Sequence, residues 1–293
     1  MKTYIESFFD KKRNIYIMEG ILLIMSLFLH WYRLDEIPFG IHVDEAGMGY
    51  DAWCLANFGV DRYLTKFPVY LTNFGGGQSA LYAYLCALLL KMTGGAPTVF
   101  IMRMPAAIMG IIMLLTGTML IKEVAGEKAG LLSMILFTIC PYFMMQSRFG
   151  LDCNLMLPIS TIALLFLVKA LKTRKKRFFV LSGIFWGITC YAYAISYLII
   201  PFFLLLTLLY LIYTKNIEWK EVVLLGFPIA VIALPLILFV MVNTFQLNEI
   251  TTPLFTIPRL PRYRAAEFTL DSDVLVANTK KIMTDIFFGD SIK

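Results

Sequence analysis

Residues 34–50 read Leu34-Asp-Glu-Ile-Pro-Phe-Gly-Ile-His42-Val-Asp44-Glu45-Ala-Gly-Met-Gly-Tyr50. They open the region 34–98, the only long stretch of the chain that is neither steadily apolar nor steadily charged. A pair of carboxylates directly after the first hydrophobic segment predicts negative charge at the mouth of a helix bundle, because a charge on a lipid-facing wall is costly. We therefore expect residues 34–98 to form a large loop that carries the active site.

The composition predicts a polytopic, all-α membrane protein. Of the 293 residues, 59% are hydrophobic and only 16% are charged, and the mean hydropathy is +0.74. A chain of this size cannot bury so much apolar surface in one soluble core. The net charge of +6 comes from cations in short connections between apolar segments, as in cytoplasmic loops. We expect the lipid bilayer as a partner and no nucleic acid.

Two cationic clusters set the expected orientation. Lys11-Lys12-Arg13 precedes the first span and indicates a cytoplasmic N-terminus, and Lys172-Thr-Arg-Lys-Lys-Arg177 indicates a second cytoplasmic loop. The apolar run Ala80 to Lys91 is shorter than the roughly 17–25 residues that a spanning helix needs. Counting it as a span would also place residues 172–177 outside. We therefore expect it to be a helix at the outer interface, within a first outer loop that lies outside the cell membrane.

About seven transmembrane helices follow from this assignment. The apolar run 178–213 would be roughly 54 Å long as one helix, which exceeds a hydrocarbon core of roughly 30 Å, so we expect two spans with a turn near Tyr191 to Ser196. Residues 1–242 then form a transmembrane module, and residues 243–293 form an extracytoplasmic tail or the start of a C-terminal part. The other spans are expected at 15–31, 99–121, 129–145, 155–171 and 222–242.

This topology brings the polar residues that need an explanation to one outer face. Carboxylates at a membrane mouth accept a proton from a hydroxyl or an amine. Arginines and tyrosines there hold a phosphate whose lipid tail stays in the bilayer. These residues are His42, Asp44, Glu45, Asp51, Asp61, Arg62, Arg148, Asp152, Tyr191, Tyr193, Arg259, Arg262 and Arg264.

The arrangement resembles the GT-C superfamily of membrane glycosyltransferases. The likeness rests on the acidic pair Asp44-Glu45 after the first span, on Arg103-Met-Pro-Ala-Ala-Ile-Met-Gly110, on Ser147-Arg148-Phe-Gly-Leu-Asp152 and on Tyr191-Ala-Tyr193. It is strongest to dolichyl-phosphate-mannose protein mannosyltransferases and to bacterial aminoarabinose transferases that use undecaprenyl phosphate. The resemblance implies a large first outer loop with interfacial helices. It also implies transfer of a sugar from a polyprenyl phosphate to an acceptor on the extracytoplasmic face.

The resemblance implies a mechanism with named roles. We expect Asp44 to act as the general base on the acceptor, and Glu45 to orient the acceptor or, with Asp44, to support a magnesium ion. One displacement inverts the anomeric configuration. Many relatives have an arginine a few residues after the Tyr-x-Tyr pair, where this chain has Ser196-Tyr197. Binding of the donor phosphate or of the substrate is therefore expected from other residues: Arg148, Asp152, Tyr191, Tyr193, Arg259 and Arg262.

Several alternatives stay open on the sequence alone. Asp44 can instead N-cap a helix that starts at Glu45, and Arg148 can pair with Asp152. Gly75-Gly-Gly77 indicates flexibility rather than a phosphate loop, because no Lys-Ser/Thr follows it. Cys54, Cys86 and Cys153 would face an oxidising side and could pair. The competing class is a membrane transporter or a flippase for lipid-linked sugars, although such proteins usually keep ionisable residues near the membrane midplane.

The cationic segment after the last span has its own expected role. Arg259 and Arg262 stand among prolines and fit a lid over an anionic lipid phosphate. Relatives of this kind generally continue with further spans. We therefore expect the chain to be the amino-terminal half of a larger transferase, or a natural truncation of one. The expected acceptor is a protein, a lipid or a glycan.

Overall fold

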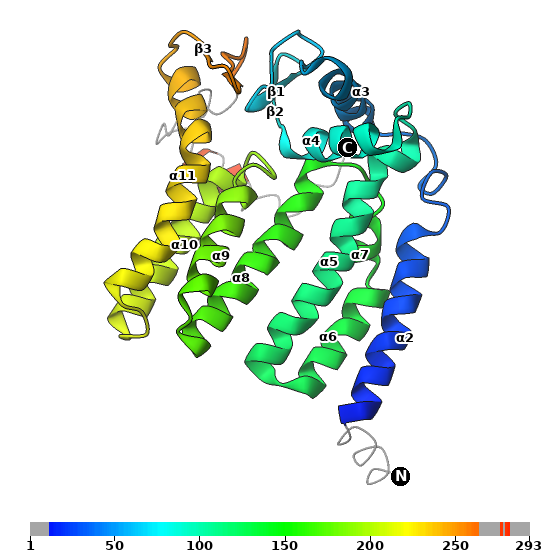
Figure 1. Cartoon of the computed structure of the whole chain (residues 1–293), viewed down its shortest axis with the longest axis vertical. Helices are drawn as coiled ribbons and strands as arrows, with labels where there is room; N and C mark the ends of the chain where they lie inside the picture. The colour runs from blue at the N-terminus through cyan, green and yellow to red at the C-terminus, as the bar shows by residue number, and fades with distance from the viewer. Residues whose placement is uncertain (1–11, 264–275, 278, 282–293) are drawn as a thin grey trace.

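The computed structural model describes residues 12–263, 276, 277 and 279–281. Long helices run side by side, and a cap of short helices and strands covers one end of them (Figure 1). The first described helix, α2, begins at the opposite end of the bundle and leads into this cap. The chain therefore has the expected architecture of a helix bundle with a large polar loop at one end.

The bundle has helical segments at the positions of all the predicted spans, but not all of these segments are long enough to cross a membrane. Among the described residues, five helices are long and apolar enough to cross a membrane: α2 (Lys12–Trp31), α5 (Val99–Ala125), the 3₁₀ helix η1 (Asp152–Leu155) continued by α8 (Met156–Thr173), α10 (Ser196–Tyr213) and α11 (Trp219–Thr244). Three shorter helices lie among them: α6 (Glu127–Ile139), α7 (Pro141–Gln146) and α9 (Lys176–Thr189). The protein is a multi-pass membrane protein.

Two of the expected spans differ from the structure in length. The expected span at 129–145 is broken between α6 and α7, because Pro141 cannot donate a backbone hydrogen bond and forces Cys140 into an extended conformation (φ −69°, ψ 121°). The run 178–213 is divided as expected, with α9 ending at Thr189 and α10 starting at Ser196. However, α9 has only 14 residues, which gives about 21 Å of helix.

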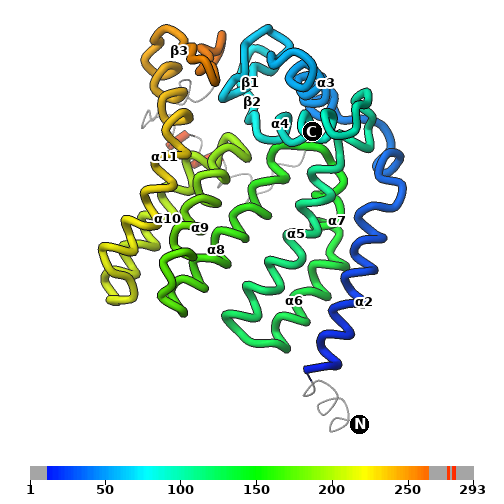
Figure 2. The backbone as a smooth tube through the Cα atoms, viewed as in Figure 1, coloured from blue at the N-terminus to red at the C-terminus, as the bar shows by residue number. Residues whose placement is uncertain are grey.

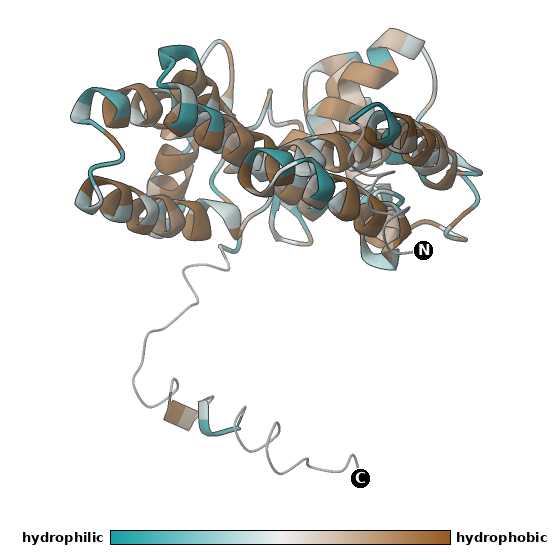
Figure 3. Cartoon of the chain, turned by 90° about the horizontal axis from the view of Figure 1, so that it is seen from below, coloured by the Kyte–Doolittle hydropathy of each residue, from teal (hydrophilic) through white to brown (hydrophobic). Residues whose placement is uncertain are grey.

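The helices pack in an order that differs from their order in the chain. Neighbouring helices follow the sequence α2, α6, α5, α8, α9 and α11, and α10 packs weakly on α9; Figure 2 shows the same arrangement as a tube. Viewed from below, the helices are mainly hydrophobic, and hydrophilic residues gather in the connections (Figure 3). The outward faces are thus suited to lipid.

The cap is built from the loop that follows α2. It contains α3 (Val43–Phe58), α4 (Leu81–Thr93) and an antiparallel hairpin of β1 (Tyr70–Asn73) and β2 (Gly76–Ser79). The expected short helix at 80–91 is confirmed as α4, and it lies across the end of the bundle (Figure 1). The hairpin was not expected, because the glycines at 75–77 indicated a flexible loop. All five cysteines are free, so the alternative in which Cys54, Cys86 and Cys153 pair is not found.

A buried tyrosine attaches α4 to α5. The Tyr82 hydroxyl donates to the Met102 carbonyl (2.8 Å) and accepts from the Ala106 backbone N–H (3.3 Å). The hydroxyl therefore lies between the Met102 carbonyl and the Ala106 N–H, which would otherwise form a backbone hydrogen bond of α5. Because Tyr82 is fully buried, these bonds fix the cap against the bundle at a single point of α5.

The segment after α11 folds back onto the first loop. It contains β3 (Ile250–Thr251) and β4 (Thr256–Ile257), and Val69 N–H donates to the Thr256 carbonyl at 2.9 Å. The Asn243 side chain donates to the Pro258 carbonyl and accepts from the Leu260 N–H. This part of the predicted extracytoplasmic tail is therefore anchored to the cap.

The placement of α4 across the end of the bundle makes a topological prediction. In a background without native cysteines, Phe74→Cys and Ala96→Cys should both react with an impermeant thiol reagent added to intact cells, and Lys175→Cys should not. All three positions are exposed. Labelling of positions 74 and 96 from opposite sides would mean that α4 crosses the membrane, and would contradict this arrangement.

Candidate active site

A buried ion pair fixes the site by joining α3 to α5. Arg103 is fully buried, and its Nε and one terminal nitrogen donate to Glu45 Oε1 (3.1 Å) and Oε2 (3.3 Å). The remaining N–H groups of Arg103 donate to three carbonyls of the loop before α3: Leu34, Pro38 and Gly40. All five guanidinium donors are satisfied. Arg103 therefore fixes the start of the loop and the first turn of α3 together.

Glu45 is saturated by contacts within the protein. Besides Arg103, its oxygens accept from Gly150 N–H (2.6 Å) and from His42 N–H (2.9 Å). Gly150 permits this approach, because a Cβ there would lie 2.8 Å from the Met102 carbonyl oxygen. The side chain of Glu45 is only 1% exposed. These contacts give Glu45 a structural role in place of the expected orientation of the acceptor.

Asp44 points differently from its neighbour. His42, not Asp44, is the N-cap of α3: its Nδ1 accepts from Asp44 N–H at 3.1 Å, so the N-cap alternative for Asp44 is wrong. The Asp44 side chain is 35% exposed, and its Oδ1 accepts from the Asn73 amide at 3.2 Å. Asp44 thus presents a partly open carboxylate at the end of the bundle.

The β1–β2 hairpin holds a second carboxylate close to the first. Ser79 N–H donates to Asp152 Oδ2 (3.3 Å), and Cys153 N–H donates to Asp152 Oδ1 (3.0 Å). Burial raises the pKa of the Tyr193 phenol, and the charges of Cys153, Asp152 and Asp44 raise this pKa further, so Tyr193 lies within electrostatic range of both carboxylates. The structure therefore brings together three predicted site residues, Asp44, Asp152 and Tyr193.

Arg148 lies outside this group. Its guanidinium donates to the carbonyls of Leu29 (2.7 Å), Tyr32 (2.6 Å), Arg33 (3.1 Å) and Ile37 (3.0 Å). These carbonyls lie at and beyond the carboxyl end of α2, where a cation also complements the helix dipole. Arg148 is thus an anchor for α2, and its contacts fit neither the expected phosphate site nor the alternative pairing with Asp152.

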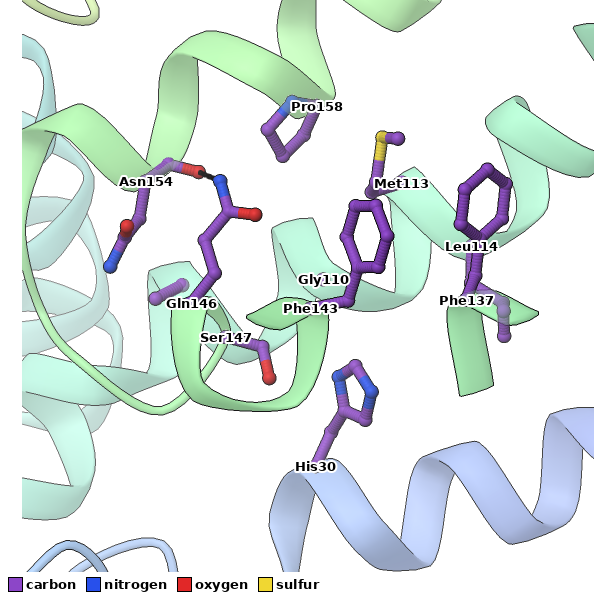
Figure 4. A pocket seen from close by; sticks show the side chains of 11 residues that line it. His30, Gly110, Met113, Leu114, Phe137, Phe143, Gln146, Ser147, Asn154 and Pro158 are labelled. Atoms are coloured by element: carbon purple, nitrogen blue, oxygen red, sulfur yellow. Dashed lines mark hydrogen bonds between the residues drawn. The ribbon is translucent and has the colours of Figure 1, made fainter. Parts of the chain in front are cut away.

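A small cavity lies at the same end of α2. Figure 4 shows His30 of α2 pointing toward it, with Gly110 of α5 and Ser147 among the other lining residues. Its free volume is about 10 Å³, which is room for one water molecule and not for a sugar. The substrate site is therefore not here.

The remaining predicted site residues contact other parts of the protein. The Tyr191 hydroxyl donates to the Ile232 carbonyl of α11 (2.8 Å), and burial raises its pKa to about 12. Arg259 is exposed and bonds the Gln246 side chain at 2.9 Å. Arg262 is exposed, but its backbone N–H donates to the Gly75 carbonyl at the hairpin turn (2.9 Å). Arg264 lies outside the described residues.

The expected magnesium pair does not fit these contacts. Each oxygen of Glu45 already has two N–H partners, so Asp44 and Glu45 cannot act as a joint ligand pair in this arrangement. Within the part of the chain that the structure describes, no group of three or more His, Cys, Asp or Glu side chains could hold a metal ion.

The sequence alone did not indicate which residues position these carboxylates. Asn73 and Ser79 come from the hairpin, and Arg103 lies inside an apolar helix. A signal for the hairpin was present: Asn-Phe-Gly-Gly is rich in residues that tolerate positive φ. For Arg103 the signal was a cation within a predicted span, which requires a buried partner.

The buried pair makes a stability prediction. Glu45→Ala leaves the Arg103 charge buried without its carboxylate, so the free energy of unfolding should fall by about 3–5 kcal/mol. The matched control is Glu36→Ala, which removes an exposed partner of Arg33 and should change it by less than about 1 kcal/mol. Thermal unfolding of the purified protein measures both. A Glu45→Ala protein that melts like wild type but loses transfer would assign Glu45 a chemical role instead.

The comparisons with known proteins agree with the fold and with the expected class. The sequence profile of the dolichyl-phosphate-mannose-protein mannosyltransferase family matches residues 78–245, more than half of the chain. This range contains Asp152 and Tyr193 but not Asp44. No curated protein matches the chain. The match confirms the expected GT-C relationship and favours an enzyme over a transporter. The chain therefore belongs to the dolichyl-phosphate-mannose-protein mannosyltransferase family of membrane glycosyltransferases.

Proposed function

We propose that this protein transfers a sugar from a polyprenyl phosphate to an acceptor at the capped end of the bundle, with Asp44 as the general base. One observation carries the proposal: of the two adjacent acids, only Asp44 keeps a partly open carboxylate, whereas Glu45 is engaged by Arg103. A general base must lie within hydrogen-bond reach of the proton that it removes. Asp44 meets this requirement for a substrate that enters the cap.

The reaction is a single displacement at the anomeric carbon. Asp44 takes the proton of the acceptor hydroxyl or amine, and the acceptor atom bonds to the anomeric carbon. The bond from this carbon to the phosphate oxygen breaks, and its electron pair leaves with the polyprenyl phosphate. The configuration is inverted. Asp152 and Tyr193 lie within electrostatic range of Asp44, and we assign them to binding of the sugar.

The donor lipid would lie in an apolar groove next to the site. This groove, of about 370 Å³, is bordered by α4, α11, residues 67–69 and the β3–β4 turn. It includes Ala80 and Tyr191, the first adjacent to Ser79 and the second close in sequence to Tyr193. A groove of this chemistry suits an isoprenoid chain whose phosphate points toward the carboxylates. Arg262, held at the hairpin turn through its backbone, is the cation that we assign to the phosphate.

The orientation proposed from the cationic loops places the cap on the extracytoplasmic side. Lys172, Arg174, Lys175, Lys176 and Arg177 lie in or next to the connection between α8 and α9, at the bundle end opposite the cap (Figure 1). Positive charge of this density marks a cytoplasmic loop. The acceptor would then be a protein, lipid or glycan outside the membrane.

Replacement of Asp44 tests the role of the base. Asp44→Asn removes basicity with almost no change in shape, so transfer should fall by about 10²- to 10⁴-fold while the melting temperature stays near that of wild type. Asp35→Asn is the matched control, because it makes the same change at an exposed position of the same loop. The measurement is release of free polyprenyl phosphate by purified protein supplied with a panel of polyprenyl-phosphate sugars. Near wild-type turnover by Asp44→Asn would exclude Asp44 as the base.

Filling the groove tests the assignment of the lipid. Leu81→Trp should raise the KM for a dolichyl-phosphate sugar by at least about tenfold, because the bulky ring displaces several methylene groups. The KM for a donor with only two isoprene units should change little. Leu88→Trp on the exposed side of the same helix serves as the control. Equal effects on long and short donors would show that the groove does not hold the chain.

A further inference from the structure

We propose that Asn73, on the β1–β2 hairpin, has two roles in the reaction: its amide nitrogen orients Asp44, and its amide oxygen accepts a hydrogen bond from the hydroxyl next to the anomeric carbon of the transferred sugar. The inference rests on the proposed function. It makes Asn73 a positioning and specificity residue.

The hairpin presents Asn73 in a rigid way. Asn73 pairs with Gly76 across a two-residue turn, Phe74-Gly75, in which both residues have positive φ (50° and 73°). This is the pattern of a type I′ turn, which matches the twist of the strands. Tyr70 stacks on Phe239 of α11 (4.4 Å between ring centroids), and Arg262 N–H donates to the Gly75 carbonyl at 2.9 Å. The hairpin is therefore fixed at its base and at its turn.

The contacts of Asn73 determine which way its amide points. One amide hydrogen goes to Asp44 Oδ1 (3.2 Å) and the other to Gln78 Oε1 (2.9 Å). An ionised carboxylate only accepts hydrogen bonds, so the nitrogen of Asn73 must face Asp44. The amide oxygen is then left buried with no hydrogen-bond partner among the residues that the structure describes, in a residue that is only 7% exposed. Buried polar atoms rarely remain without a partner.

The chemistry of this oxygen selects the ligand group. A carbonyl oxygen accepts a hydrogen bond, so it repels a phosphate and binds a hydroxyl or an amine. The acceptor atom lies about 2.6–3.2 Å from Asp44 and about 3–3.5 Å from the anomeric carbon. The sugar hydroxyl on the neighbouring carbon therefore comes close to Asp44. Asn73 also lies there, because its amide nitrogen is 3.2 Å from Asp44 Oδ1. The proton of the nucleophile goes to Asp44, so the sugar hydroxyl is the donor that remains for Asn73.

A substrate–variant cycle tests this contact. Wild type, Asn73→Ala and Asn73→Asp are supplied with dolichyl-phosphate mannose and with dolichyl phosphate carrying 2-deoxymannose, and kcat/KM is measured for each. Comparing the ratio of the two donors between variants cancels the different intrinsic reactivity of the two sugars. Phe74→Asn, at the exposed turn of the same hairpin, is the control, because asparagine tolerates its positive φ.

The expected result separates the two roles of Asn73. The preference for the 2-hydroxyl should fall by about tenfold or more in Asn73→Ala, and it should persist in Asn73→Asp, which keeps an accepting oxygen but no longer donates to Asp44. Both variants should lower kcat, and Phe74→Asn should match wild type in both respects. Equal donor ratios in wild type and Asn73→Ala would overturn the proposal and leave the oxygen to an ordered water. Absence of transfer by wild type from any polyprenyl-phosphate sugar would instead overturn the proposed function.

Discussion

The buried pair of Arg103 and Glu45 determines where the cap sits on the bundle. Both charges are removed from water, and the desolvation is offset because every donor of Arg103 and both oxygens of Glu45 have partners. A second anchor, Tyr82, bonds α5 within one turn of Arg103. The loop before α3, α3 itself and α4 are thus fixed to one segment of α5, and the site depends on that attachment.

The same constraint explains why two adjacent acids have different roles. Successive residues of a helix point about 100° apart. When Glu45 faces Arg103 inside the protein, Asp44 therefore points in a different direction, toward Asn73 of the hairpin. The capping of α3 by His42 leaves the Asp44 carboxylate uncommitted to the helix. The hairpin then brings Asn73 to Asp44 and Ser79 to Asp152. The buried ion pair thus explains one structural acid and one open acid, and the hairpin contacts both carboxylates of the site.

Hydropathy and cationic loops were sufficient to predict the helices, including the short helix α4, because both signals are local in the sequence. They did not predict the break at Pro141 or the role of Arg148, which bonds carbonyls more than a hundred residues earlier. An arginine near a membrane mouth suggests a phosphate ligand when such distant contacts are unknown. Asn73 was missed for the same reason, since it reaches Asp44 across 29 positions. The return of residues 250–263 onto the hairpin is equally nonlocal.

The stereochemistry of transfer tests most directly whether Asp44 acts as a base in a single displacement. Asp152 is a second carboxylate near the site, and it would be the nucleophile of a two-step reaction, which retains configuration. The measurement is the anomeric configuration of the product formed by purified protein from a donor of known anomer, read by NMR before any isomerisation. A single displacement predicts inversion. A product with the configuration of the donor would contradict it.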